Sequence, residues 1–164
     1  GNYSIELFKK LFKEKTNYSS FPVKGNYVTY SGKSLINNII YPPLEPGNIT
    51  PRVDAINDLN NVMKFGPDVV TAKNFNDYST NLKIIDDFYI EISKYLHSIN
   101  KTKLNIGYSG IRPKIKYKDS LYDDFVMEWY QNSCLNLFGF DSPALTSSLA
   151  IGSHVCKLIE QRLK

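Results

Sequence analysis

Arg112 is the side chain in this sequence best suited to binding a small organic acid. It stands in the run Gly110-Ile111-Arg112-Pro113, after a glycine and directly before a proline. A proline restricts the backbone of the residue before it, so the direction of Arg112 is constrained. Its guanidinium group can then form two parallel hydrogen bonds to one carboxylate. The alternative is a surface ion pair of little energetic weight. Arg52, in Thr50-Pro51-Arg52, is a second candidate anion ligand.

Tyr41 and Tyr108 are candidates to supply hydroxyl groups to the same small ligand. The alternative for each is an amphipathic strand residue at the edge of the core. Other catalytic patterns are absent from the sequence. It has no G-x-S-x-G, no G-x-G-x-x-G, and two histidines in no arrangement typical of a metal site or a nucleophile–base pair. The sequence therefore predicts neither a metal site nor a catalytic base, and no dinucleotide site of the usual βα type.

The stretch 136–155 (NLFGFDSPALTSSLAIGSHV) predicts a strand, a sharp turn and a helix. An apolar run ends at Gly139, Asp141 and Ser142 are candidate caps, and Pro143 stands where a first helical residue is expected. Such a turn directs free backbone N–H groups and the positive end of a helix dipole at one point, which makes an anion site. The alternative is a C-terminal helix that merely packs on a sheet.

The elements that must position these residues follow from hydrophobic periodicity and turn signals. Residues 4–15 and 81–99 have helical spacing, and Ser4 is a candidate cap for the first of these helices. Residues 22–31 and 35–41, separated by Ser31-Gly32-Lys33, predict an antiparallel hairpin. The remaining expected strands are residues 49–53, 61–65, 103–117, 125–130 and 134–138. We therefore expect an α+β fold, a mixed and mostly antiparallel sheet with packed helices.

Composition indicates one ordinary globular domain. The chain has 164 residues, 42% of them hydrophobic and 22% charged, with a formal net charge of +4. The lysines are scattered, so binding to nucleic acid is not supported, and no apolar run reaches membrane-spanning length. Cys134 and Cys156 lie in apolar surroundings and are interpreted as buried, reduced thiols. We expect a cytoplasmic protein, held at a membrane surface if its electrons pass to a quinone.

Several motifs together resemble one family along nearly the whole chain. They are Lys24-Gly25-Asn26-Tyr27, Ile40-Tyr41-Pro42, Phe65-Gly66-Pro67-Asp68, residues 107–114 (GYSGIRPK) and residues 136–152. In this order they resemble the C-terminal half of FAD-dependent oxidoreductases of the D-amino-acid-oxidase superfamily. The most similar branch is that of L-2-hydroxyglutarate dehydrogenase and glycerol-3-phosphate-dehydrogenase-like proteins. The chain begins with Gly1 rather than Met, and the resemblance implies a longer protein with an N-terminal FAD-binding half, in cis or in trans.

The resemblance implies roles for matching positions only. Arg112 resembles the arginine that holds the substrate carboxylate, and Tyr41 and Tyr108 would line the pocket. Ser142, Pro143, Ala144, Leu145, Thr146 and Ser147 resemble the turn that faces the flavin pyrimidine, with Thr146 near the C2 carbonyl. The implied domains are a helix in residues 1–21, a substrate-binding domain in 22–110, and a return to the FAD domain in 111–164.

One position departs from the family pattern. The family commonly has Ser-Pro-Gly-Leu-Thr, whereas this chain has Ala144 in place of that glycine. Glycine is favoured where a backbone approaches a ligand closely, so the extra methyl group is expected to crowd the flavin and weaken the contact.

Three functions remain open at this level. The first is the substrate domain of a flavoenzyme that oxidises a small 2-hydroxy acid such as 2-hydroxyglutarate, inactive without its FAD-binding half. The second is a non-catalytic module that binds small carboxylates through Arg112. The third is a relic of a split gene, without activity, whose exposed face would favour self-association.

Overall fold

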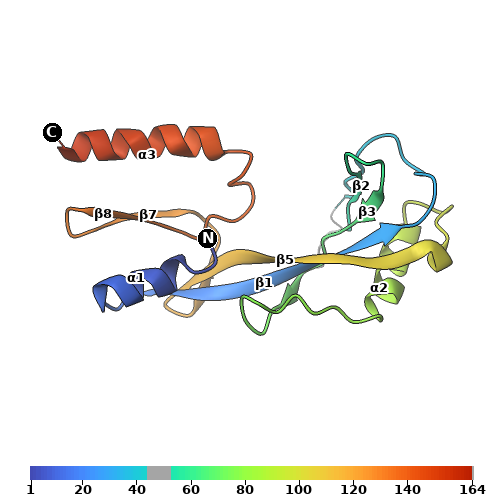
Figure 1. The fold of residues 1–164 in the computed structure, drawn as a ribbon, viewed down its shortest axis with the longest axis horizontal. Coiled ribbons are helices and arrows are strands. Elements are labelled where there is room, and N and C mark those ends of the chain that lie inside the picture. Colours follow the sequence, from blue (N-terminus) through green and yellow to red (C-terminus); the bar gives the residue numbers. More distant parts are fainter. Residues whose placement is uncertain (44–52, 164) are drawn as a thin grey trace. The chain divides into compact units, whose positions relative to one another are not determined.

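The computed structural model describes residues 1–43 and 53–163, and these form three α-helices, one short 3₁₀ helix and eight strands. Their bounds are α1 Ser4–Phe12, β1 Tyr18–Tyr30, β2 Ala55–Asn57, β3 Met63–Phe65, β4 Val70–Thr71, α2 Ile84–Ser93, η1 Lys101–Lys103, β5 Leu104–Tyr117, β6 Ser120–Tyr122, β7 Val126–Tyr130, β8 Cys134–Phe138 and α3 Ser148–Leu163. The predicted α+β class is confirmed (Figure 1).

The strands form two antiparallel groups. One sheet has the order β2-β3-β1-β5-β6, with β4 paired to β1, and a separate hairpin joins β7 to β8. Val28 of β1 lies opposite Phe65 of β3, and Ala55 of β2 lies opposite the same phenylalanine. In the hairpin, Glu128 lies opposite Asn136. The longest strands of the sheet are β1, with 13 residues, and β5, with 14 residues.

The chain divides into two compact units. Unit 1 comprises residues 1–22 and 112–164, and unit 2 comprises residues 23–111. In unit 1, Ile5 and Phe8 of α1 pack against Phe138 of β8 and Ile115 of β5. The β7–β8 hairpin lies between α1 and α3 (Figure 1). In unit 2, the core joins the sheet to α2 through buried residues that include Val28, Met63, Phe65, Ile84, Phe88 and Ile92.

Amphipathic spacing predicted most of these elements. α1 begins at Ser4 as expected, although the Ser4 side chain donates to the carbonyl of Gly1 instead of capping the helix. The predicted strand 103–117 is β5, and the predicted strands 125–130 and 134–138 are β7 and β8. The expected strand at 61–65 is the shorter β3. The strand expected at 49–53 lies almost wholly outside the described residues.

The predicted hairpin of residues 22–31 and 35–41 is wrong in its second strand. Only a single bridge, Ile40 to Ala55, forms in 35–41, while β1 pairs with the distant strands β3 and β4. In this segment, side chains satisfy a backbone group in place of strand-to-strand hydrogen bonds. Ser34 Oγ and Asn57 Nδ2 both donate to the carbonyl of Ile36. Local side-chain bonds of this kind compete with strand pairing.

Three further expectations on the helices need correction. The predicted helix 81–99 is limited to α2, and Leu82, which lies within the predicted helix but before α2, is 75% exposed. The helix expected from Pro143 begins at Ser148, after a series of turns. Cys156, expected to be buried, is exposed on α3, and Cys134 is half-buried; both are free thiols. Within the described residues, no helix is long and apolar enough to cross a membrane.

Candidate functional site

Arg112 lies near the middle of β5, where the chain re-enters unit 1, and it is anchored through one edge of its guanidinium group. Its Nε donates to Oδ1 of Asp141 at 3.1 Å. The side chain of Arg112 is 32% exposed and that of Asp141 is 13% exposed. Among the described residues, none accepts a hydrogen bond from the two terminal nitrogens of Arg112. Those nitrogens form the edge that binds a carboxylate bidentately.

Asp141 also lies within ion-pair distance of a second cation, Lys114. Lys114 Nζ lies 3.9 Å from Oδ2 of Asp141 and 2.8 Å from the exposed carboxylate of Asp123. Asp141 was predicted to be a helix cap, but its side chain is instead turned toward β5. Arg112 and Lys114 therefore share the well-shielded carboxylate of Asp141, while Lys114 is paired more closely with Asp123.

The segment Ser142–Ser147 follows Asp141 directly and is folded into consecutive turns. The backbone N–H of Ala144 donates to the carbonyl of Asp141 at 2.7 Å, and that of Ser147 donates to the carbonyl of Pro143 at 3.0 Å. The Thr146 hydroxyl donates to the carbonyl of Pro143. Ser142, Pro143, Leu145 and Thr146 are exposed, and Leu145 is 87% exposed. The segment thus presents a mostly open surface one residue beyond the Arg112–Asp141 pair.

Tyr41 and Tyr108, the other two predicted ligand residues, belong to unit 2. The ring of Tyr108 stacks on that of Tyr27 with centroids 4.6 Å apart, and Lys64 Nζ lies 5.4 Å from its centroid. Tyr108 is 50% exposed and Tyr41 is 59% exposed. Their role in a site stays a prediction. Arg52 lies outside the described residues.

A polar pocket in unit 2 was not predicted. It has a volume of about 450 Å³ and is lined by Lys24, Asn26, Asp68, Asp77, Ser79 and Thr80, among others. Lys24, only 7% exposed, donates from Nζ to the carbonyl of Ser79 and lies 3.4 Å from Asp77 Oδ1. The sequence feature that could have predicted this pocket is Lys24-Gly25-Asn26, which places two polar residues inside a strand. Buried polar side chains require hydrogen-bond partners, so other polar groups were to be expected nearby.

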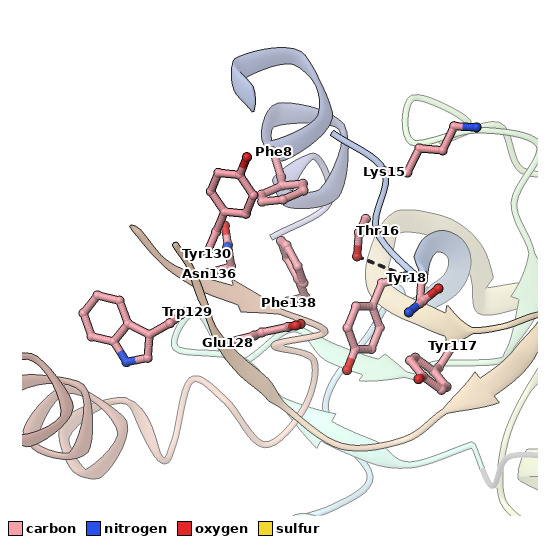
Figure 2. A pocket seen from close by; sticks show the side chains of 11 residues that line it. Phe8, Lys15, Thr16, Tyr18, Tyr117, Glu128, Trp129, Tyr130, Asn136 and Phe138 are labelled. Atoms are coloured by element: carbon pink, nitrogen blue, oxygen red, sulfur yellow. Dashed lines mark hydrogen bonds between the residues drawn. The ribbon is translucent and has the colours of Figure 1, made fainter. Parts of the chain in front are cut away.

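A second pocket, in unit 1, is lined mainly by aromatic rings and also has a volume of about 450 Å³. Figure 2 shows Phe8, Tyr130 and Phe138 gathered together, with the Lys15 ammonium group directed away from the rings. Burial, followed by the charge of Glu128, raises the pKa of Tyr18 at this pocket. None of the predicted ligand residues lines it, so it stands apart from the Arg112 site.

Comparison with known proteins relates the chain to one group of enzymes. No protein-family model matches it. It is 39% identical over 152 residues to the mitochondrial L-2-hydroxyglutarate dehydrogenase of Arabidopsis thaliana, a match that covers 84% of this chain and 31% of the plant protein. The chain therefore spans about a third of the length of that relative.

The fold agrees with this relationship. The structure superposes with a TM-score of 0.75 on dithionite-reduced L-α-glycerophosphate oxidase from Mycoplasma pneumoniae, a structure with FAD bound. That match covers 98% of this chain and 41% of the oxidase, at 18% sequence identity. The chain therefore belongs to the L-2-hydroxyglutarate dehydrogenase family, and the resemblance to FAD-dependent oxidoreductases that its motifs predict is confirmed.

Proposed function

We propose that this chain is the substrate-binding part of a FAD-dependent oxidoreductase that oxidises a small 2-hydroxy acid of the 2-hydroxyglutarate type. The observation that carries the proposal is the way in which the guanidinium group of Arg112 is held. Its guanidinium group is held through Nε beside Asp141, with its carboxylate-binding edge unpaired among the described residues. The identity to an enzyme named for L-2-hydroxyglutarate supports a hydroxy acid as the ligand.

The residues of the turn are compatible with a flavin. Within the described part of the chain, no group accepts a hydrogen bond from the backbone N–H groups of Leu145 and Thr146, and both residues are exposed. They precede α3, so the positive end of its dipole lies close by. These N–H groups and the helix dipole would stabilise a negatively charged or electron-rich oxygen of a flavin ring.

The chain's own residues would bind and orient the substrate. Arg112 would hold the carboxylate, and Tyr41 and Tyr108 of unit 2 are retained as predicted substrate ligands. FAD, when bound, would supply the redox chemistry by accepting a hydride from the substrate carbon. The N–H groups of Leu145 and Thr146 would favour the negative charge that this transfer produces. No residue of this chain is assigned as the base.

The proposal implies a nucleotide-binding part, in cis or in trans, as the chain's partner. The half-buried Ala144 bears on its fit, because its methyl group replaces the glycine common in the family. Substituting Ala144→Gly is expected to tighten flavin binding, since the backbone then approaches the ring more closely.

The test is a titration of FAD, followed by flavin fluorescence and absorbance. It is run on this protein alone and on this protein mixed with the remaining two thirds of the plant enzyme as a separate polypeptide. We expect FAD binding only in the mixture, and bleaching of the flavin absorbance on addition of L-2-hydroxyglutarate.

The outcomes separate the alternatives. Bleaching that is lost in Arg112→Ala would support the proposed function. Binding of 2-hydroxyglutarate by this protein without FAD binding in any mixture would favour a non-catalytic carboxylate module. Binding of neither ligand would overturn both and leave the relic.

A further inference from the structure

We infer that Asp141 is a positioning residue that sets the orientation of Arg112 and ties it to the flavin-facing turn. This inference rests on the proposed role of Arg112 as the carboxylate ligand. It goes beyond that role because it states what directs the guanidinium group, which has no other hydrogen-bond acceptor among the described residues.

The geometry of the pair selects one edge of the guanidinium group. Asp141 Oδ1 accepts from Nε of Arg112 at 3.1 Å, whereas Arg–carboxylate pairs often engage two nitrogens side by side. Occupying only Nε leaves the terminal nitrogens as a planar fork. The carboxylate of Asp141 is 13% exposed, so it is better shielded from water than the arginine that it holds. A shielded acceptor of this kind fixes the donor more strictly than an exposed one.

The position of Asp141 is itself fixed by the backbone around it. Gly139, two residues earlier, has a φ of +70°, and a Cβ at this position would lie 2.8 Å from Ile115 Cδ1 of β5. The turn is thus packed against the same strand that carries Arg112. The backbone N–H of Asp141 donates to the carbonyl of Gly139, and the carbonyl of Asp141 accepts from Ala144. One residue therefore connects β5 to the segment 142–147 through both its side chain and its backbone.

The consequence concerns the reaction geometry. A hydride donor carbon must lie within contact distance of its acceptor, and small errors of placement are costly. If Arg112 fixes the carboxylate and the segment 142–147 faces the flavin, the Arg112–Asp141 bond fixes one relative to the other. Asp141 then acts through Arg112 without touching the substrate.

Removing the charge of Asp141 tests this inference, because a carboxylate that positions Arg112 and one that is only its neighbour predict opposite changes in ligand affinity. A carboxylate that is only a neighbour of Arg112 repels an anionic ligand, so its removal would tighten ligand binding by about a few-fold. A positioning carboxylate has the opposite effect: its removal would weaken binding by roughly tenfold, because the fork loses its orientation. Asp141→Asn keeps an oxygen acceptor in place and is expected to recover part of the loss.

The experiment measures the affinity of this protein for L-2-hydroxyglutarate by calorimetry in the wild type, Asp141→Ala, Asp141→Asn and Arg112→Ala. Asp123→Asn is the matched control, because it removes one charge from the same cluster while leaving the Arg112 contact intact. The ¹⁵N signal of the Arg112 Nε–H group provides a second readout, since a hydrogen-bonded Nε–H exchanges slowly with water.

Weaker binding and a fast-exchanging Nε–H in Asp141→Ala, with partial recovery in Asp141→Asn, would support the positioning role. Tighter binding in Asp141→Ala, equal to that in Asp123→Asn, would overturn it while leaving the proposed function intact. If Arg112→Ala binds as well as the wild type, the proposed function fails at its ligand and the positioning role fails with it. An unchanged Nε–H signal in Asp141→Ala would also overturn the inference.

Discussion

Asn26 donates three hydrogen bonds to the carboxylate of Asp68. Its backbone N–H reaches Oδ1 at 2.7 Å, and its Nδ2 reaches Oδ1 at 3.0 Å and Oδ2 at 2.9 Å. The remaining oxygen of Asn26 accepts from Ser109 Oγ at 2.7 Å. Asn26 is only 5% exposed. This residue therefore joins β1, β5 and the segment after β3, with every polar atom of its amide satisfied.

Removing the Asn26 amide is expected to destabilise the protein. Asn26→Ala removes the two Nδ2 hydrogen bonds to Asp68 and the oxygen that accepts from Ser109, while the backbone N–H bond to Asp68 remains. The loss is expected to cost about 1–3 kcal/mol. The free energy of unfolding in urea measures the effect. Asn37→Ala, at an exposed position, is the control and should change stability by about 0.5 kcal/mol or less. Equal midpoints for the two variants would show that the Asn26 network contributes nothing.

Acid should weaken the protein through Asp77. The Ser79 hydroxyl, the Lys73 backbone N–H and Lys24 hold the pKa of Asp77 well below its ordinary value of 3.8. A lowered pKa in the folded state means that the stabilisation is complete above about pH 4 and is lost as pH falls toward the lowered pKa. Urea unfolding at a series of acidic pH values should show this decline.

Asp77→Asn should flatten that acid decline, because the neutral amide takes up no proton. The matched control is Asp87→Asn on α2, an exposed carboxylate in the same unit. If wild type and Asp77→Asn lose stability in parallel below about pH 4, the carboxylate of Asp77 is not the group responsible.

Alkali should weaken unit 2 through Tyr95. Its hydroxyl donates to the carbonyl of Val53 at 2.9 Å. Burial, and then the charge of Asp54, raise the pKa of Tyr95 above its ordinary value of 10.0. The stabilisation is therefore complete below about pH 10 and declines as pH rises toward the raised pKa. Tyr95→Phe should be less stable near neutral pH by about 1 kcal/mol and show a smaller alkaline decline. Tyr78→Phe, at a 55% exposed position, is the control for the titration. If stability declines as much at alkaline pH in Tyr95→Phe as in the wild type, Tyr95 is not the group responsible.

Two glycines should respond to alanine in opposite directions. Gly139→Ala forces an alanine into a φ of +70° and brings its Cβ against Ile115, so a loss of about 1–3 kcal/mol is expected. Gly152→Ala, inside α3 with no atom near the added Cβ, should gain about 0.5–1 kcal/mol. Thermal unfolding of both variants gives the comparison. A neutral Gly139→Ala would mean that the turn before Asp141 is not held against β5.

Local patterns were sufficient where an element's own residues decide its conformation. The apolar spacing of Ile5 and Phe8 predicted α1, and the apolar runs in residues 125–130 and 134–138 predicted the strands β7 and β8, although their pairing into a hairpin was not predicted. Pairing across long sequence separations was not predictable in this way. The Gly32 turn favoured a hairpin with residues 35–41, but β1 instead pairs with β3, because Val28 and Phe65 become fully buried together.

The sequence by itself determined the chemical types at the candidate site: a proline-restricted Arg112, the small and polar segment Ser142–Ser147, and a motif order that identifies the family. Only the tertiary structure decided how Arg112 is held. Asp141 has the residue type and spacing of a helix cap, yet its carboxylate binds Arg112, which lies 29 residues earlier in the chain. The physical reason is that a carboxylate in a shielded position gains more from a charged guanidinium group than from a neutral backbone N–H. That charged partner is brought within reach only when the turn packs against β5.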